Sequence, residues 1–253
     1  MKTRFCLAAL VCLTSLHAQE PPSAKDLAAK LADAVWDGSS TARLKMDFQP
    51  SAGGEKTVLQ LKINARRTRE GTGVHYQVLW PKDRKDESFV LRQPAGQPAT
   101  GSVLQAAVKP ITNIQDGIFG SDLAYEDLVG NYFAWDNQKI TGAETIGRIP
   151  CQILESKPGK GDNSSYGSIR TWIDTKRMVP LKVEKFGPGG QLVRRITITL
   201  VTRDDTNRTV PANFTIERPG KAARTILEGS NIRHDVTLTD ADFSPDVLRG
   251  ASP

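Results

Sequence analysis

The sequence contains little cysteine, and most of it lies at the start. Cys6 and Cys12 fall within the first 18 residues, so a chain without that segment would keep only Cys151. A single cysteine forms no intramolecular disulfide, so stability must come from a hydrophobic core. A chain of this length buries roughly 70–75% of the surface that it exposes when unfolded, which is sufficient. Cys151 lies in an apolar strand pattern and is predicted to be a buried hydrophobic residue rather than a reactive thiol.

Sequence motifs of the common enzyme classes are absent as well. There is no Gly-x-Ser-x-Gly, no His-Glu-x-x-His, no Cys-x-x-Cys, no P-loop and no dinucleotide fingerprint. Beyond the N-terminal segment only His75 and His234 remain, each in a strand pattern beside polar residues, which favours structural histidines over catalytic ones. Asp122, Glu126 and Asp127 could form a metal or acid–base cluster, but a helix cap and first-turn charges explain them more simply. We therefore expect no enzyme, metal or cofactor.

The longest apolar run is too short to span a membrane. It covers residues 5–16, follows two cations and is followed by the small residue Ala18. A spanning helix needs about 20 apolar residues. This arrangement is typical of a secretory signal peptide cleaved between Ala18 and Gln19, rather than of a buried N-terminal helix. Cys12 lies inside the apolar run after a bulky residue, so we do not expect it to be lipidated. The sequence thus predicts removal of residues 1–18 and a diffusible periplasmic product.

The net charge is small and dispersed. It is +6 for the whole chain and +4 once the two cations of the signal segment are removed. Acidic residues are interspersed with basic ones, whereas a nucleic-acid-binding protein shows a concentrated basic stripe. We therefore expect no nucleic-acid partner, while the positive charge could favour transient contact with anionic lipid headgroups at a membrane surface. A solvated protein face is the simpler explanation for this balance.

Residues 19–253 show no linker and no repeat, so one domain is predicted. Ser23 can cap an amphipathic helix over residues 24–36, which places Leu27 and Leu31 on one face. From residue 41 onward the apolar period changes from helical to two, which indicates strands. Short turns, such as 51–54 and 187–190, give antiparallel neighbours. Ten strands are predicted, at 41–48, 58–63, 74–80, 138–146, 149–156, 168–174, 178–186, 191–203, 210–218 and 223–236.

This pattern predicts a mainly β fold with a few helices (α+β), built on a single, strongly curved antiparallel sheet or partly open barrel; a β-sandwich is the main alternative. Several strands carry bulky apolar residues on both faces, as Trp172 does beside Ile173. Two apolar faces are needed when one side meets a covering helix and the other forms a lipid-sized cleft. Ordinary packing against an inserted segment explains the pattern equally well.

Residues 94–137 interrupt the strand pattern. Asp122 can cap a short helix that ends at Gly130, and the simplest interpretation is a well-capped helix that covers one end of the sheet. Within it, residues 120–128 (GSDLAYEDL) resemble the GSDFSYEDL segment of the LolA-like outer-membrane lipoprotein-sorting family. Residues 172–184 resemble the central hairpin of that family, and residues 240–248 resemble its C-terminal ending. The residues that match the motif are Gly120, Ser121, Asp122, Tyr125, Glu126, Asp127 and Leu128; Leu123 and Ala124 replace the usual Phe and Ser.

The resemblance implies an unclosed half β-barrel covered by helices, with residues 19–253 as a single LolA-like lipid-binding domain. Its hydrophobic cavity would accept the acyl chains of a lipoprotein or phospholipid. Such binding needs no catalytic group, because burying each methylene contributes about 0.8 kcal/mol. The candidate cavity-lining residues, chosen for aromatic bulk and strand position, are Trp80, Phe89, Phe119, Tyr125, Trp172 and Phe186.

Three functions fit these features. The first is a periplasmic carrier or binder of acylated cargo, with lipid acyl chains or a lipoprotein as partner and an inner-membrane transporter as a further candidate partner. The second is a periplasmic interaction or sensor module that serves an envelope transport system without chemistry. The third, an enzyme built on the cavity, has no motif to support it, so the carrier is favoured.

Overall fold

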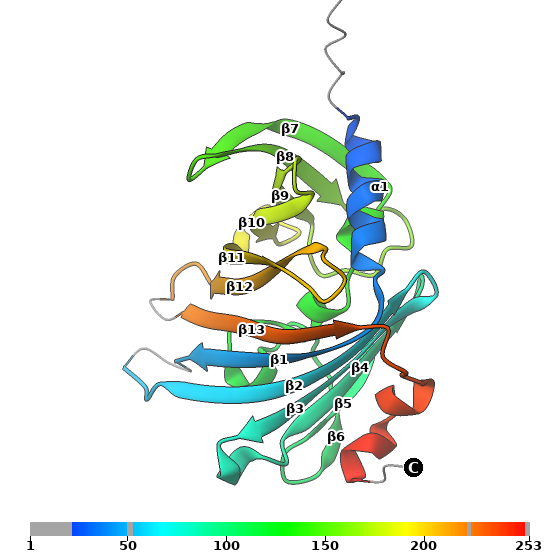
Figure 1. The fold of residues 1–253 in the computed structure, drawn as a ribbon, viewed down its shortest axis with the longest axis vertical. Coiled ribbons are helices and arrows are strands. Elements are labelled where there is room, and N and C mark those ends of the chain that lie inside the picture. Colours follow the sequence, from blue (N-terminus) through cyan, green and yellow to red (C-terminus); the bar gives the residue numbers. More distant parts are fainter. Residues whose placement is uncertain (1–21, 50–52, 222–223, 251–253) are drawn as a thin grey trace, which may run out of the picture.

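The computed structural model describes residues 22–49, 53–221 and 224–250; the predicted signal peptide lies outside them. In these ranges thirteen strands form one antiparallel sheet, in the order β6-β5-β4-β3-β2-β1-β13-β12-β11-β10-β9-β8-β7. Neighbours in the sheet are also neighbours in sequence, except where β1 pairs with β13 (Figure 1). The sheet is curved and unclosed, with β6 and β7 at its two edges. The strands are β1 Gly38–Phe48, β2 Thr57–Thr68, β3 Gly71–Trp80, β4 Ser88–Pro94, β5 Thr100–Leu104, β6 Val108–Pro110, β7 Asn137–Ile146, β8 Ile149–Lys157, β9 Ser168–Asp174, β10 Val179–Phe186, β11 Leu192–Arg203, β12 Thr209–Glu217 and β13 Arg224–His234.

The prediction of one curved antiparallel sheet is confirmed, and the β-sandwich alternative is wrong. All ten predicted strands are present, but the sequence analysis missed β4, β5 and β6. β4 begins with four consecutive buried residues and β5 has none, so neither shows the alternation that marks a half-buried strand. The true interruption therefore starts at residue 111, not 94. The chain reverses between β2 and β3 at residues 69–70.

One α-helix lies in the described part of the chain. It is α1, Ala24–Val35, and the predicted cap is confirmed, since the Ser23 hydroxyl accepts a hydrogen bond from the Asp26 amide at 3.2 Å. Its buried residues Leu27 and Leu31 pack with Leu154 of β8 and other residues at that end of the sheet. No helix within the described ranges is both long and apolar enough to cross a bilayer. The remaining helical turns are 3₁₀: η1 Lys82–Arg84, η2 Ile118–Gly120, η3 Tyr125–Leu128, η4 Tyr132–Ala134, η5 Asp240–Phe243 and η6 Pro245–Arg249.

The helix predicted to begin at Asp122 is not formed. The residues that follow adopt a single 3₁₀ turn, η3, whose cap position is Ala124, and Gly130 has no left-handed backbone. Asp122 is instead buried, with its backbone amide donating to the Thr225 hydroxyl of β13 at 2.9 Å. The tertiary hydrogen bond thus replaces the local capping bond that the sequence suggests.

The C-terminal turns η5 and η6 pack on the face of β3–β5 opposite the main core. Phe243 is 1% exposed, and a Cβ atom on Gly73 would lie 2.8 Å from its ring, so only glycine fits at that position. The Arg66 guanidinium lies 5.6 Å from the centre of the same ring. His75 is also on β3, and burial lowers its pKa to about 4, with Lys62 adding to the effect. This histidine is therefore neutral at physiological pH, which fits a structural role.

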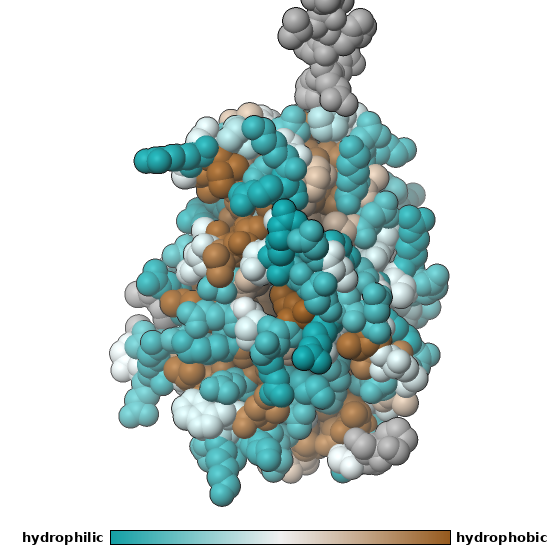
Figure 2. Space-filling view, viewed as in Figure 1, coloured by the Kyte–Doolittle hydropathy of each residue, from teal (hydrophilic) through white to brown (hydrophobic). Residues whose placement is uncertain are grey.

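Both faces of the sheet are apolar near β8–β11, as the sequence predicts. Thr171 and Ile173 of β9 lie on the side of α1, whereas Trp172 between them joins a separate cluster with Cys151 and Leu181. Cys151 is free and 2% exposed, and burial raises its pKa, so the prediction of a buried hydrophobic residue is confirmed. In the view of Figure 2, small hydrophobic patches alternate with hydrophilic side chains.

The large core lies on one face of β1–β4, which gives a direct test. Leu61 of β2 is fully buried, whereas its neighbour Gln60 points to the other side and is exposed. We expect Leu61→Ala to lower the free energy of unfolding by about 2–5 kcal/mol, because it removes packed methyl groups and leaves a cavity. Gln60→Ala should change it by less than about 0.5 kcal/mol. Urea unfolding of the two variants measures the difference; equal losses would contradict the assigned faces.

Candidate functional site

The inner face is the apolar side of the sheet that α1 and residues 111–135 cover. Every strand from β1 to β4 contributes to it, and β12 and β13 extend it. Its strands alternate inward apolar residues with outward polar ones, for example Met46 between Lys45 and Asp47. The inner face is therefore a continuous hydrophobic surface. Its buried side chains are Leu44, Met46, Phe48, Leu59, Leu61, Ala65, Val74, Tyr76, Val78, Phe89, Leu91, Ile216 and Leu227.

Residues 111–135 fill the space over this surface, and we call them the plug (Figure 1, green). The plug contains a tight loop in which the Ile118 amide donates to the Leu123 carbonyl at 2.8 Å. A Cβ atom on Gly117 would lie 1.7 Å from the Ser121 carbonyl oxygen, so the loop requires glycine there. The sequence predicted a hollow covered by helices. Within the described residues there is instead one α-helix, at one end, and an irregular plug that occupies the hollow.

Aromatic rings hold the tip of the plug to the sheet. Phe89 of β4 stacks on Tyr76 at 4.9 Å between ring centres, and it receives Phe119 at 5.4 Å and Tyr125 edge-on at 4.9 Å from the plug. Phe119 has a left-handed backbone with φ of 52°, which costs an ordinary residue roughly 1–2 kcal/mol. The packing of its ring offsets that strain. Displacing the plug would release the backbone strain at Phe119.

A buried ion pair fixes the middle of the plug. The Asp127 carboxylate accepts hydrogen bonds from Lys185 Nζ and the Tyr166 hydroxyl, both at 2.7 Å, and lies 3.1 Å from Arg194 Nη1. The side chains of Asp127, Lys185 and Arg194 are 1%, 6% and 3% exposed. Arg194 also donates to Tyr166, and its Nε donates to the Asp122 carbonyl at 2.7 Å. The two cations lie on β10 and β11, so this cluster joins the plug to the sheet.

The electrostatics of this cluster follow from its burial. Desolvation raises the pKa of Asp127, but the positive charges of Lys185 and Arg194 and the hydrogen bonds outweigh it, so the net pKa is lowered. Burial and the neighbouring Asp127 carboxylate raise the pKa of Tyr166 above its ordinary value. Asp127 is thus ionised and Tyr166 is a neutral donor at physiological pH.

The other two acids of the predicted motif have separate partners. Glu126 accepts hydrogen bonds from the Ser164 hydroxyl at 2.7 Å and the Ser165 amide at 2.9 Å, and Gln115 donates to it as well. Asp122 pairs with Thr225, as described above. The three carboxylates therefore point to different partners and form no shared metal or acid–base cluster.

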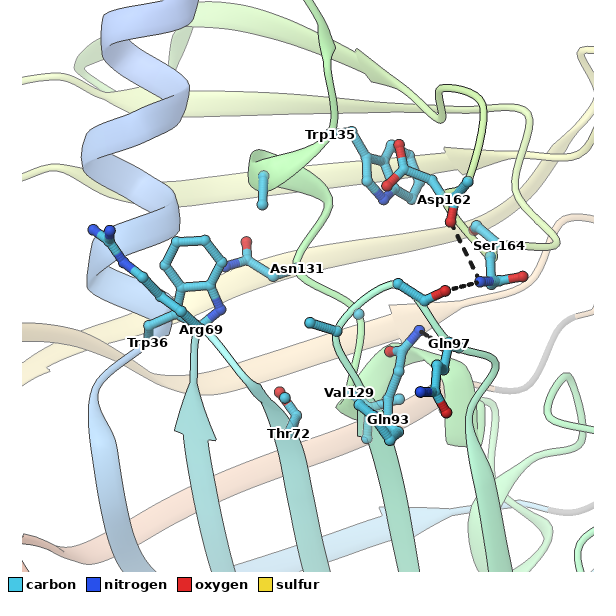
Figure 3. Close-up of a pocket in the computed structure, with 18 of the residues that line it drawn as sticks. Trp36, Arg69, Thr72, Gln93, Gln97, Val129, Asn131, Trp135, Asp162 and Ser164 are labelled. Atoms are coloured by element: carbon cyan, nitrogen blue, oxygen red, sulfur yellow. Dashed lines mark hydrogen bonds between the residues drawn. The ribbon is translucent and has the colours of Figure 1, made fainter.

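A small cavity opens at one end of the plug (Figure 3). It has a volume of about 170 Å³, below the roughly 300–1,000 Å³ of a typical ligand pocket. Its lining mixes polar and apolar groups: Trp36 after α1, Arg69 at the β2–β3 turn, Trp135 at the end of the plug and Asp162 in the loop after β8. Asn131 of the plug also lines it, and its buried Oδ1 has no hydrogen-bond partner. The cavity is an opening beside the plug and not an acyl-chain pocket in itself.

The structure brings together half of the predicted lining residues. Phe89, Phe119 and Tyr125 are in mutual contact between the plug and the inner face. The other three lie elsewhere. Trp80 is 50% exposed at the end of β3, Trp172 belongs to the cluster on the opposite face, and Phe186 lies under the Arg170 guanidinium on that side. Their aromatic bulk suggested a common site, but strand parity places Trp172 and Phe186 on the opposite face, and Trp80 lies exposed at the end of its strand.

Four residues of the site escaped the sequence analysis: Tyr166, Lys185, Arg194 and Thr225. A signal for two of them was present, because Lys185 occupies an inward position after Val183, and Arg194 one before Ile196. A charged residue at an inward strand position indicates a buried partner. That partner, the predicted motif residue Asp127, lies 58 positions before Lys185 and farther still from Arg194, and only the fold pairs them.

One other group of side chains could hold a metal ion among the described residues. Ligand atoms of Asp204, Asp205 and His234 lie within 4.8 Å of one another. His234 Nδ1 lies 2.9 Å from Asp205, and Asp204 accepts hydrogen bonds from the amides of Thr206 and Arg208. These contacts join the β11–β12 turn to the end of β13 and account for the group without an ion.

Comparison with known proteins identifies this architecture. A family model described as an uncharacterized protein matches residues 98–250, more than half of the chain. A search of the curated proteins finds no match. The structure is similar to a DUF1329 family protein from Desulfovibrio piger, with a TM-score of 0.80, 22% identity and coverage of 89% of this chain and 97% of the other.

Two further solved structures share the fold. A domain from Vibrio parahaemolyticus, proposed to be an outer membrane lipoprotein-sorting protein, has a TM-score of 0.77 at 21% identity, over 88% of this chain and 97% of the other. A LolA superfamily protein from Nitrosomonas europaea has a TM-score of 0.70 at 15% identity, over 90% of this chain and all of the other. At these identities the likeness establishes the fold.

The buried pair predicts a large effect of Asp127→Asn on stability. The substitution leaves two buried cations without a counter-charge, so we expect the free energy of unfolding to fall by about 3–5 kcal/mol. The control is Asp246→Asn, which removes an exposed pair with Arg249 and should cost less than about 1 kcal/mol. Chemical denaturation of both variants tests this, and a loss at Asp127 no greater than the control would refute the proposed anchor.

The same pair predicts a difference in acid stability. Asp127 has a lower pKa in the folded than in the unfolded state, so its contribution is complete above an unfolded value of about 4 and is lost as the pH falls below it. The stability difference between the wild type and Asp127→Asn should therefore shrink as the pH decreases below about 4. Unfolding free energies measured across this range test the effect; a constant difference would mean that Asp127 carries no such linkage.

Proposed function

The chain belongs to the family whose model matches residues 98–250 and has the fold of a LolA superfamily protein, and we propose that it binds the acyl tails of a lipid or lipoprotein on its inner face, where they take the place of the plug. The main support for this proposal is the kind of segment that covers the inner face. A hydrophobic surface that spans six strands is covered there by an irregular segment instead of a second sheet or a layer of helices.

The plug is attached to the sheet mainly by side chains. The backbone–backbone hydrogen bonds of residues 112–135 all lie within that segment, and the last such bond to a strand joins the Ile111 amide to the Gly101 carbonyl. Moving the plug would therefore break aromatic contacts and the hydrogen bonds of Asp122, Glu126 and Asp127, but no strand pairing. The sheet can keep its structure while its cover is exchanged, which is what a binding site beneath a plug requires.

The energies of the two covers are comparable. Burying the five plug residues of the core contributes roughly 8–15 kcal/mol at about 1.5–3 kcal/mol for each side chain; they are Ile118, Phe119, Leu123, Tyr125 and Val129. An acyl chain that buries a dozen methylenes contributes about 10 kcal/mol at about 0.8 kcal/mol each. Since plug and chain would cover the same surface, one can replace the other without leaving the inner face exposed to water.

The proposal includes no chemical step and no cofactor. The signal-like N-terminal segment supports a periplasmic location, and a carrier there would receive cargo from a membrane, with an inner-membrane transporter as a candidate donor. An interaction or sensor module on the same fold is the alternative. It would bind a protein and leave the plug in place, so a test of plug displacement separates the two functions.

Weakening the plug should strengthen acyl binding. Phe119→Ala removes the ring that packs on Phe89 while leaving every inner-face residue in place. Because a ligand that displaces the plug must overcome its packing, the apparent Kd of a fluorescent fatty acid should fall at least about tenfold, the equivalent of 1.4 kcal/mol. Fluorescence titration of the wild type and the variant measures the change.

Trp80→Ala is the control for this experiment. Trp80 has similar aromatic bulk but is half exposed and lies outside the plug contacts, so its removal should leave the Kd unchanged. An unchanged or weaker affinity in Phe119→Ala would place the ligand somewhere other than beneath the plug. Failure of the wild type to bind any acyl chain would reject the carrier function itself.

A further inference from the structure

The charges of the site are divided between its two parts. The plug carries Asp127, whereas the two cations that pair with its carboxylate, Lys185 and Arg194, lie on β10 and β11. Both cations are almost fully buried beneath the plug. If the plug moves, its acids move with it and the cations remain on the sheet.

Two cations left on an apolar surface need a new partner. Their immediate surroundings on the inner face include Ile169 and Val183, with Ile196 beside Arg194, so few other polar groups are available to them. A charge in such surroundings is costly unless it is paired and hydrogen-bonded. An apolar tail alone would cover the surface but leave this cost uncompensated. A ligand that carried an anion next to its tail would meet both requirements.

We propose that the cargo is an anionic amphiphile, whose negatively charged headgroup replaces the Asp127 carboxylate on Lys185, Arg194 and Tyr166 while its tail covers the inner face. This rests on the proposed function and names the ligand class for that site. The plug serves as the model for the ligand, because Asp127 presents a carboxylate and the preceding residues Phe119 and Leu123 present apolar bulk. Lys185 Nζ and the Tyr166 hydroxyl, both 2.7 Å from Asp127 Oδ1, would donate to the incoming anion.

The headgroup must belong to an amphiphile and not to a free ion. A free phosphate ion could pair with the cations only after the plug had left, and it carries no hydrocarbon to cover the surface that the plug exposes. The cations lie between the large core of β1–β4 and the smaller cluster of β9 and β10, so a bound anion would have apolar surface on both sides. The inner face would therefore recognise the charge and the tail of the ligand at the same place.

The test compares two ligands that differ only in the headgroup. A fluorescent fatty acid and the matching fatty alcohol are titrated at neutral pH, and the ratio of their Kd values is measured. Both ligands displace the same plug, so plug stability cancels from this ratio. We expect the wild type to prefer the acid by at least about tenfold, since hydrogen bonds between charged groups are the strong ones.

Lys185→Met should reduce the preference for the acid over the alcohol by about tenfold. The variant keeps the Arg194–Asp127 pair and the apolar stem, so the buried charges stay balanced and the fold is retained. Lys182→Met is the matched control, three residues earlier on the same strand but over Trp172 on the opposite face, and should leave the ratio unchanged. Inorganic phosphate alone, titrated as a competitor, should not displace the fatty acid.

The outcomes separate the two proposals. Equal binding of acid and alcohol by the wild type, or a ratio that Lys185→Met leaves intact, would overturn the anionic headgroup while the acyl-binding function stands. Competition by phosphate at the concentration of the fatty acid would also overturn it, because the site would then recognise a free ion. If neither amphiphile binds the wild type, the carrier function fails before the headgroup is tested.

Discussion

The pairing of Asp127 with Lys185 and Arg194 is the interaction on which the organisation of this molecule depends. A curved sheet with a hydrophobic inner face must cover that face, and two buried cations on β10 and β11 determine what kind of cover it accepts. A purely apolar cover would bury unpaired charge at a cost of several kcal/mol. The plug meets the requirement because it supplies one carboxylate at the right place together with aromatic bulk. The hydrophobic inner face and its two buried cations thus both favour the plug as the cover.

The second apolar face would let the sheet keep its structure if the plug were removed, as the proposed function requires. Trp172, Cys151 and Leu181 form a cluster on the side opposite α1, and Phe243 packs on the outer side of β3. These contacts bury surface that does not involve the plug. The strands also pair continuously from β6 to β7, so their backbone hydrogen bonds are independent of residues 112–135. Stability is in this way distributed over both faces, while the exchangeable contacts are confined to one.

The sequence predicted the elements well where the pattern was strong and local. Period-two alternation located ten strands, and Ser23 located the start of α1, because both signals depend only on near neighbours. β4 and β5 lacked alternation and were missed. The site was predicted only in part, since Phe89, Phe119 and Tyr125 meet across the fold but Trp172 is turned away by one residue of register. The role of Asp127 depends on partners distant in sequence, which no local pattern reveals.

An internal plug also answers a difficulty that any carrier of hydrophobic cargo faces. A site that simply gained free energy from burying a long tail would hold it too tightly to deliver it, and an emptied site would expose apolar surface to water. Competition by the plug lowers the net affinity by the free energy of its own docking, at tenfold for each 1.4 kcal/mol. The strained backbone of Phe119 and the cost of burying the Asp127 pair both reduce that docking energy. Under the proposed function, cargo and plug would therefore exchange near balance, so that binding and release both remain accessible on the same surface.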